Sequence, residues 1–261
     1  MNKKFLFFLA ALTGSFSANA QLSKTETVEL LQKIDDALSN LKTVVYKIDY
    51  KDKRFSGKDT LRTIAVCSLY IAKSDKMNAY NSVDALREIT HSYPGSCQHM
   101  KYDGKKALFA SARVDTLDKV RLSIDTERQA RLGVVRSYSN LLLTEYFTEK
   151  KLFGKLSAVT DKIVVKEEML NGKPVYVITF ALEDTEDYRD RIVKQYISKA
   201  SYLPVALYSF ARWENMEEYA YTEVDYLAVN PDIPLEAFKV HEDEAVDLKE
   251  RYKAFKEKAK L

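Results

Sequence analysis

The amino-acid sequence predicts an α+β protein, mainly antiparallel β, in which a curved, incomplete β-barrel carries helices against its concave face. Three observations lead to this fold class. Apolar side chains alternate with a period of two over long stretches of the chain, as in strands with one buried face. The 17 tyrosines and 12 phenylalanines favour pleated, half-buried surfaces. Only 7 glycines interrupt these stretches, so the strands are long, and long antiparallel strands curve into barrels.

The first twenty residues have the pattern of a secretory signal peptide. Lys3 and Lys4 give a positive start, residues 5–12 are an uncharged apolar run, and Ala18-Asn19-Ala20 is a cleavage site of small residues. The alternative, a membrane anchor, needs roughly 20 apolar residues, and this run is much shorter. We therefore expect an exported, periplasmic protein that is cleaved near Ala20.

Composition restricts the partners. Residues 1–20 contain Lys3 and Lys4 and no acidic residue, so the remaining chain keeps 39 of the 41 basic residues beside 38 acidic ones. A net charge near +1 gives no electrostatic reason to expect nucleic acid as a partner. No later segment is apolar enough to be expected to span a membrane.

The order of predicted elements is a helix, a series of hairpins, a helical insertion and a second series of strands. Residues 25–41 form an amphipathic helix that Thr25 can cap. Val44, Tyr46, Ile48 and Tyr50 give the next strand one apolar face. Further strands are predicted at 61–72, 77–80, 86–91, 98–102, 105–110, 163–169, 175–182, 192–198, 205–211 and 217–228. Two-residue hairpin turns are predicted at Asp103-Gly104 and Asn171-Gly172.

Three segments leave alternatives open. The stretch 126–132, which begins a helical region, is ambiguous. Residues 139–153 form a predicted helix with a wide apolar face, which is either a core helix or a lid over an apolar cavity. Residues 242–261 are rich in Lys and Glu and predict a charged tail that is a solvated helix or disordered. The domain boundaries are therefore 1–20 for the signal peptide, 21–241 for one domain and 242–261 for the tail.

Cys67 and Cys97 are the two cysteines of the chain. An oxidising compartment permits a disulfide between them. The alternative is two buried free thiols, which behave as small hydrophobic side chains. The sequence does not decide between these, because it does not give the separation of the two Cα atoms.

Several short motifs in the second half of the chain resemble the LolA-like and LolB-like superfamily of outer-membrane lipoprotein-sorting proteins. They are the hairpin around Asn171-Gly172-Lys173-Pro174, the strand that leads into Leu203-Pro204-Val205, and the final strand that runs into Asn230-Pro231. Tyr102-Asp103-Gly104-Lys105 resembles an earlier hairpin of that family. Tyr202 stands where the family usually has glycine, and Asn171 where it often has aspartate.

The resemblance implies an incomplete barrel around an apolar cavity that carries lipid or lipoprotein acyl chains, without a cofactor or a metal. On this basis the candidate ligand-binding residues of the cavity and its lid are Tyr46, Ile48, Leu142, Tyr146 and Phe147. The alternative for each is an ordinary core residue. Burying each methylene of an acyl chain contributes about 0.8 kcal/mol, so such a cavity would suffice to hold one.

Enzymatic functions find little support in the sequence. The three histidines are widely spaced, and the chain has no H-E-x-x-H, G-x-S-x-G or P-loop motif. Three functions therefore remain. The first is a periplasmic carrier or chaperone for a hydrophobic ligand. The second is a non-catalytic interaction or scaffold domain of the cell envelope, with an envelope protein as its partner. The third is an enzyme of unknown class. Of the three, we expect that the chain is not an enzyme.

Overall fold

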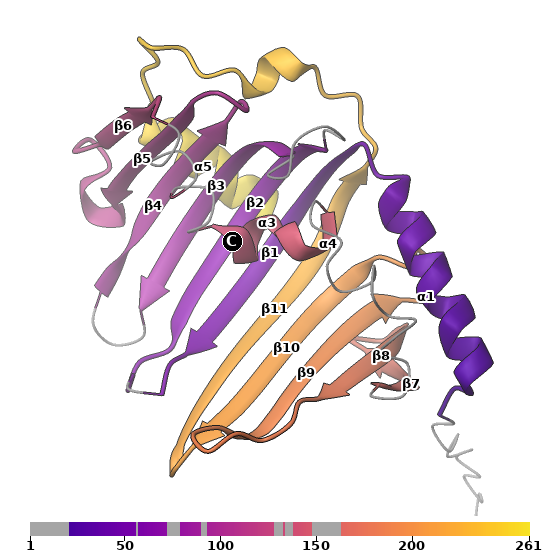
Figure 1. Ribbon diagram of the computed structural model, residues 1–261. Coiled ribbons are helices and arrows are strands. Elements are labelled where there is room, and N and C mark those ends of the chain that lie inside the picture. Colours follow the sequence, from indigo (N-terminus) through magenta and orange to yellow (C-terminus); the bar gives the residue numbers. More distant parts are fainter. Residues whose placement is uncertain are drawn as a thin grey trace, which may run out of the picture.

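The computed structural model describes residues 21–55, 57–71, 79–89, 93–127, 133, 138–147 and 163–261. The predicted signal peptide, most of the ambiguous stretch 126–132 and the second half of the predicted helix 139–153 lie outside the described residues. Within them the chain forms one curved, antiparallel sheet of eleven strands (Figure 1). The strands are β1 (Thr43–Lys53), β2 (Leu61–Ile71), β3 (Ala79–Ile89), β4 (Tyr93–Tyr102), β5 (Ala107–Arg113), β6 (Arg121–Asp125), β7 (Ile163–Leu170), β8 (Lys173–Ala181), β9 (Arg189–Ser198), β10 (Pro204–Trp213) and β11 (Met216–Val229).

The strand order is β6-β5-β4-β3-β2-β1-β11-β10-β9-β8-β7. Each half of the chain is a meander, and the pairing of β1 with β11 joins the two halves at the middle of the sheet. The sheet is open, with β6 and β7 at its two edges. The predicted fold class is confirmed. Because β6 and β7 are the two edge strands, the connection between them joins opposite edges of the sheet.

The two faces of the sheet carry different helices. We call the face that packs against α1 (Lys24–Ser39), α3 (Ser139–Leu142) and α4 (Thr144–Phe147) the inner face. The outer face packs against α5 (Leu248–Ala259). Side chains alternate between the faces along each strand. On β1 the buried inner side chains are Val44, Tyr46, Ile48 and Tyr50.

Helix α1 begins one residue earlier than predicted, and its cap differs. Ser23 accepts a hydrogen bond from the backbone N–H of Glu26, while the Glu26 carboxylate accepts one from the backbone N–H of Ser23. This reciprocal capping box satisfies two backbone donors. The prediction of Thr25 as the cap was therefore wrong, because Ser23 has the glutamate at the required spacing of three residues.

The two predicted hairpin turns have different outcomes. Leu170 pairs with Lys173, so Asn171-Gly172 is the predicted two-residue turn, and both residues have positive φ angles of 51° and 76°. At Asp103, by contrast, Tyr102 pairs with Ala107, which makes a four-residue loop. The Asp103 carboxylate stabilises the longer loop by accepting hydrogen bonds from the backbone N–H groups of Lys105 and Lys106.

Two strands differ from their predictions. The separate strands predicted at 77–80 and 86–91 are parts of one strand, β3, whose middle contains the acidic residue Asp84 on the outer face. Its carboxylate is bonded there by His99 and Arg251, which allows a charged residue inside a central strand. Strand β6 was not predicted, because it is a short edge strand of five residues, three of them exposed, with only Leu122 and Ile124 as apolar residues.

The predicted helix over 139–153 is interrupted within its described part. Helices α3 and α4 are each one turn long, and Leu143 between them has a left-handed conformation with φ of 47°. Such a conformation is unfavourable for a leucine and must be held by the surroundings. The Leu143 side chain is buried in the inner-face core, which provides that packing.

The charged tail docks on the sheet. Asp247 caps α5 by accepting hydrogen bonds from the backbone N–H groups of Lys249 and Glu250. Leu248, Phe255 and Ala259 are buried against the outer face. The tail is therefore helical, as one alternative had it, but its helix is not simply solvated: a narrow apolar stripe is enough to dock it. In the described part of the chain, none of the helices has the length and apolar character that a membrane span requires.

Candidate functional site

The five predicted ligand-binding residues come together on the inner face. Tyr46 and Ile48 belong to β1, Leu142 to α3, and Tyr146 and Phe147 to α4, and all five lie in one buried cluster. All five side chains are at most 2 % exposed. The Tyr46 ring lies 5.6 Å from the ring of Phe147 and 6.3 Å from that of Tyr226 on β11. In this structure the α3–α4 segment (residues 138–147) therefore fills the inner face over the middle of the sheet.

The carbonyl oxygen of Leu141 anchors this segment. It accepts a 2.7 Å hydrogen bond from the Tyr46 hydroxyl and a 3.6 Å contact from the Cys67 thiol. Burial, followed by the neighbouring Cys67 and Tyr226 groups, raises the pKa of Tyr46 well above its usual value, so the hydroxyl stays protonated and remains a donor. The buried end of a one-turn helix thus has a partner for a carbonyl that its own short helix leaves free.

Two further polar contacts trace the segment across the sheet. The Tyr138 hydroxyl donates to the Gln98 amide oxygen on β4 at 3.0 Å, and its ring lies 6.0 Å from that of Phe109 on β5. The Asn140 amide donates to the Tyr50 hydroxyl on β1 at 3.1 Å. From Tyr138 to Phe147 the segment therefore passes from the β4–β5 side of the inner face to the β1–β11 middle.

The two cysteines are free and buried. Cys67 lies in the inner-face core, whereas Cys97 lies in an outer-face cluster with Leu248 of α5. The strand β3 separates their strands, and neighbouring strands are about 4.8 Å apart. Burial raises the pKa of the Cys97 thiol to about 12 and that of Cys67 further still. Opposite faces and an intervening strand place the two thiols beyond the reach of a disulfide.

Gln195 is an unusual polar residue of the inner face. It lies on β9 between Ile178 and Leu207 in the cross-strand register and is fully buried. Among the described residues, neither its amide nitrogen nor its amide oxygen has a hydrogen-bond partner. Leaving such a group unsatisfied costs about 1–3 kcal/mol, so this side chain is a candidate for contacting a polar group of a ligand.

A basic pocket lies beside the apolar core at the β3–β6 end of the inner face. Its volume is about 580 Å³, within the usual range of small-molecule sites. Four basic side chains line it together with hydroxyl groups, and none of the described residues that line it is acidic. The residues that define it here are Arg87, Ser96, Ser111, Arg113, Lys119 and Arg121.

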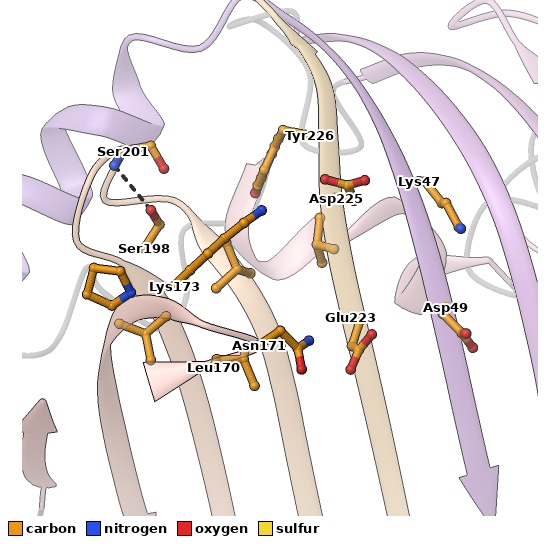
Figure 2. Close-up of a pocket in the computed structure, with 14 residues that line it drawn as sticks. Lys47, Asp49, Leu170, Asn171, Lys173, Ser198, Ser201, Glu223, Asp225 and Tyr226 are labelled. Atoms are coloured by element: carbon orange, nitrogen blue, oxygen red, sulfur yellow. Dashed lines mark hydrogen bonds between the residues drawn. The ribbon is translucent and has the colours of Figure 1, made fainter. Parts of the chain in front are cut away.

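A second pocket, of about 460 Å³, lies on the outer face between the β7–β8 hairpin turn and strands β1 and β11. Figure 2 shows Lys47 and Asp49 on β1 beside Glu223 and Asp225 on β11. Three of these groups have structural partners. Asp49 pairs with Arg62, Lys47 donates to the carbonyl oxygen of Ala259, and Glu223 accepts from Tyr221. This second pocket is therefore a polar groove whose charges are largely engaged in holding the sheet and α5.

The histidines do not gather into a site in the described chain. His99 is buried on the outer face, where its Nδ1 lies 3.0 Å from the Asp84 carboxylate, and His91 lies outside the described residues. Over the described ranges, no three His, Cys, Asp or Glu side chains form a group that could hold a metal ion.

The sequence did not single out the basic pocket, Gln195 or the anchoring carbonyl of Leu141. The four basic residues come from β3, the end of β5, the loop after it and β6, so only the strand pairing brings them together. Arg87, Arg113 and Arg121 share the inner face with Gln98 because each occupies an alternate position in paired strands. The sequence signal for this pocket was the spacing of two between the polar residues Ser96 and Gln98 on β4 and between Ser111 and Arg113 on β5.

No family model matches the sequence, and no curated protein matches it. Among solved structures, LprF from Mycobacterium bovis matches with 7 % identity over 83 % of this chain and 98 % of that chain, at a TM-score of 0.44. The lipoprotein LppX from Mycobacterium tuberculosis matches with 10 % identity over 82 % and 100 % of the two chains, at 0.42. A LolA superfamily protein from Nitrosomonas europaea matches with 9 % identity over 82 % and 97 %, at 0.27.

Proposed function

We propose that this chain is a periplasmic carrier or chaperone that binds a hydrophobic ligand, such as lipid or lipoprotein acyl chains, on the inner face of its sheet. The observation that carries the proposal is the way in which the α3–α4 segment covers that face. It does so with two one-turn helices that contact the sheet through large apolar side chains and through the carbonyl oxygen of Leu141, which accepts a hydrogen bond from Tyr46.

A single helical turn has almost no stability of its own, because nucleation is unfavourable and short helices are marginal in water. The α3–α4 segment therefore keeps its conformation through packing on the sheet. An acyl chain offers the same apolar contact, at about 0.8 kcal/mol for each buried methylene. A ligand can thus replace Leu142, Tyr146 and Phe147 on the inner face, and the segment acts as a lid that occupies the site when the ligand is absent.

Two other features support this function. The unpaired amide of Gln195 lies on the inner face among apolar neighbours, where a polar atom of a ligand would satisfy it. The N-terminal signal pattern, with cleavage expected near Ala20, supports export to the compartment in which acyl chains must cross an aqueous space.

The experiment that tests the proposal compares cavity-creating variants in the lid and outside it. In Phe147→Ala and Leu142→Ala the lid competes less well with a ligand, so both variants should bind a lipid-like fluorescent probe more tightly than the wild type. Ile34→Ala is the control, because Ile34 is equally buried in the same core but belongs to α1. Equal probe binding by all four proteins would overturn the lid, and absence of binding in all would overturn the carrier.

Native mass spectrometry of the protein purified from its own envelope adds an independent measurement. A co-purifying lipid or acylated peptide supports the carrier. A clean mass, with no uptake of added lipopeptide, would favour the second candidate function, an interaction domain.

One observation favours that second function. Phe55 after β1, Tyr188 before β9 and Trp213 at the end of β10 form an aromatic cluster, with ring separations of 5.6 Å and 6.2 Å from Phe55. Tyr188 and Trp213 are exposed. Exposed Tyr and Trp side chains are enriched at protein interfaces. Loss of an envelope-protein partner on Trp213→Ala, with lipid binding unchanged, would assign this cluster to protein interaction.

A further inference from the structure

The apolar inner face and the basic pocket are continuous along two neighbouring strands. On β4 the inner side chains run from Ser96 and Gln98, which line the pocket, to Met100 and Tyr102, which lie in the core. On β5 the same order runs from Arg113 and Ser111 toward Phe109 and Ala107 in paired register. Each step of two residues covers about 6.6 Å. The face therefore changes from polar and basic to apolar over a distance comparable to one lipid headgroup.

Tyr138 stands at the boundary between the two regions. Its hydroxyl donates to Gln98 on the pocket side, while its ring packs against Phe109 and the inner-face core. Burial raises the pKa of Tyr138 to about 12, although the positive charge of Arg87 opposes this. Arg87 pairs in register with Ser96 on β4, two positions from the Gln98 side chain to which Tyr138 donates.

Three of the four basic groups of the pocket are available to a ligand. Arg113 is paired with Asp115, at 2.7 Å. Arg87, Lys119 and Arg121 have no carboxylate partner among the described residues. Guanidinium groups bind phosphate and carboxylate oxygens through paired hydrogen bonds, and nearby Ser96 and Ser111 add hydroxyl donors.

We propose that the basic pocket binds the anionic headgroup of an amphiphilic ligand whose apolar chains lie on the adjoining inner face. This inference rests on the proposed carrier function and specifies its ligand class as a lipid with a net negative headgroup. A lipid of this kind and a free phosphate compound both carry an anionic phosphate group. Only the lipid also has an acyl chain that contacts the inner face.

The test uses the full mature chain and three soluble probes: short-chain phosphatidylglycerol, phosphatidylcholine with the same acyl chains, and glycerol phosphate. Binding is measured by calorimetry at low and high salt. The pocket variant is Arg87→Gln with Arg121→Gln, which leaves the Arg113–Asp115 pair intact. The control variant is Lys166→Gln with Lys253→Gln, which removes the same charge from exposed positions outside the pocket. Circular dichroism verifies that both variants are folded.

The wild type and the control variant should bind phosphatidylglycerol with an affinity at least about tenfold higher than their affinity for phosphatidylcholine. The pocket variant and high salt should both remove this preference. Equal binding of both lipids, unchanged in the pocket variant, would overturn the inference and leave the carrier function standing. Binding of glycerol phosphate alone, lost in the pocket variant, would overturn both and identify a site for a free phosphate compound. Absence of binding by every probe would also overturn both.

Discussion

The hydroxyl group of Tyr46 donates a 2.7 Å hydrogen bond to the carbonyl oxygen of Leu141, ninety-five positions further along the chain. Both groups are buried, so the bond has no competition from water. It links the middle strand of the sheet to the segment that crosses the inner face. This single bond gives the first prediction.

Tyr46→Phe should lower the free energy of unfolding by about 1–3 kcal/mol, because the buried carbonyl of Leu141 loses its main partner while the ring packing is kept. Hydrogen exchange should also accelerate at residues 139–147 more than in the strands. Urea unfolding and exchange mass spectrometry measure these two effects. The matched control is Tyr226→Phe, which removes a hydroxyl bonded to the Pro204 carbonyl oxygen, outside the lid. Equal acceleration in both variants would contradict an anchoring role for Tyr46.

A second prediction concerns the docked tail. Phe255 is 2 % exposed beneath α5, so Phe255→Ala should cost about 3–5 kcal/mol of stability or release the helix. Limited proteolysis should then cut within residues 242–261. Lys253→Ala, on the exposed side of the same helix, should leave the unfolding midpoint almost unchanged. A tail that stays protected in Phe255→Ala would show that the apolar stripe does not hold it.

A third prediction follows from Asp84, which joins β3 to α5. Arg251 donates to its two carboxylate oxygens at 2.8 Å and 2.9 Å, and His99 lies 3.0 Å away. Burial alone would raise the pKa of Asp84, but the hydrogen bonds and charges of His99 and Arg251 outweigh it, and the net pKa is lowered.

A lowered folded-state pKa means that the ionised form stabilises the folded protein above the unfolded-state pKa, which is about 3.9 for aspartate. This contribution is lost as the pH falls below that value and through the folded-state pKa. Thermal unfolding between pH 3 and 7 should therefore show less loss of stability at acid pH in Asp84→Asn than in the wild type. Lys239→Gln breaks an exposed pair with Glu236 and should keep the wild-type pH profile.

The sequence predicted most of the fold because its strands have strong local signals. Alternation identified β1, and Asn171-Gly172 fixed the β7–β8 register through two residues with positive φ. The five residues predicted to bind a ligand lie together in the inner-face core, since large side chains at the right period gather in a core. Ligand binding by them stays a prediction. What failed depended on contacts distant in sequence. The sequence predicted a break in β3 at the acidic residue Asp84, because the residues that stabilise its carboxylate lie on β4 and α5.

The basic pocket and the interruption at Leu143 could not be predicted for the same reason. Pocket residues 87 and 121 come together only through two intervening strands. The left-handed conformation of Leu143 contradicts its intrinsic preference, and only packing in the core compensates for it. Local patterns do not contain such tertiary effects.

A fourth prediction distinguishes the two states that the sequence left open for the cysteines, a disulfide or two free thiols. Cys67 and Cys97 should remain free thiols after oxidation of the folded protein, because they lie on opposite faces of the sheet. Both should also react slowly with maleimide before unfolding, since burial raises both pKa values and lowers the thiolate fraction. Mass spectrometry should find two labels after labelling in guanidinium chloride and almost none in native buffer. An intramolecular disulfide in protein from the periplasm would contradict the arrangement of β2 and β4.

The last prediction compares two glutamines on the inner face. Neither amide atom of Gln195 is bonded within the described part of the chain, whereas Gln98 accepts from Tyr138 and donates to Ser96. Replacing each by methionine keeps the length of the side chain and removes its polar atoms. Gln195→Met should therefore raise the unfolding free energy of the ligand-free protein by about 1–2 kcal/mol, because an unsatisfied amide disappears, while Gln98→Met should lower it by a similar amount. Urea unfolding of the two variants measures the contrast. If Gln195 serves a polar group of the ligand, Gln195→Met should also weaken ligand binding despite its higher stability. Destabilisation by both substitutions would instead mean that Gln195 is satisfied in solution and has no such role.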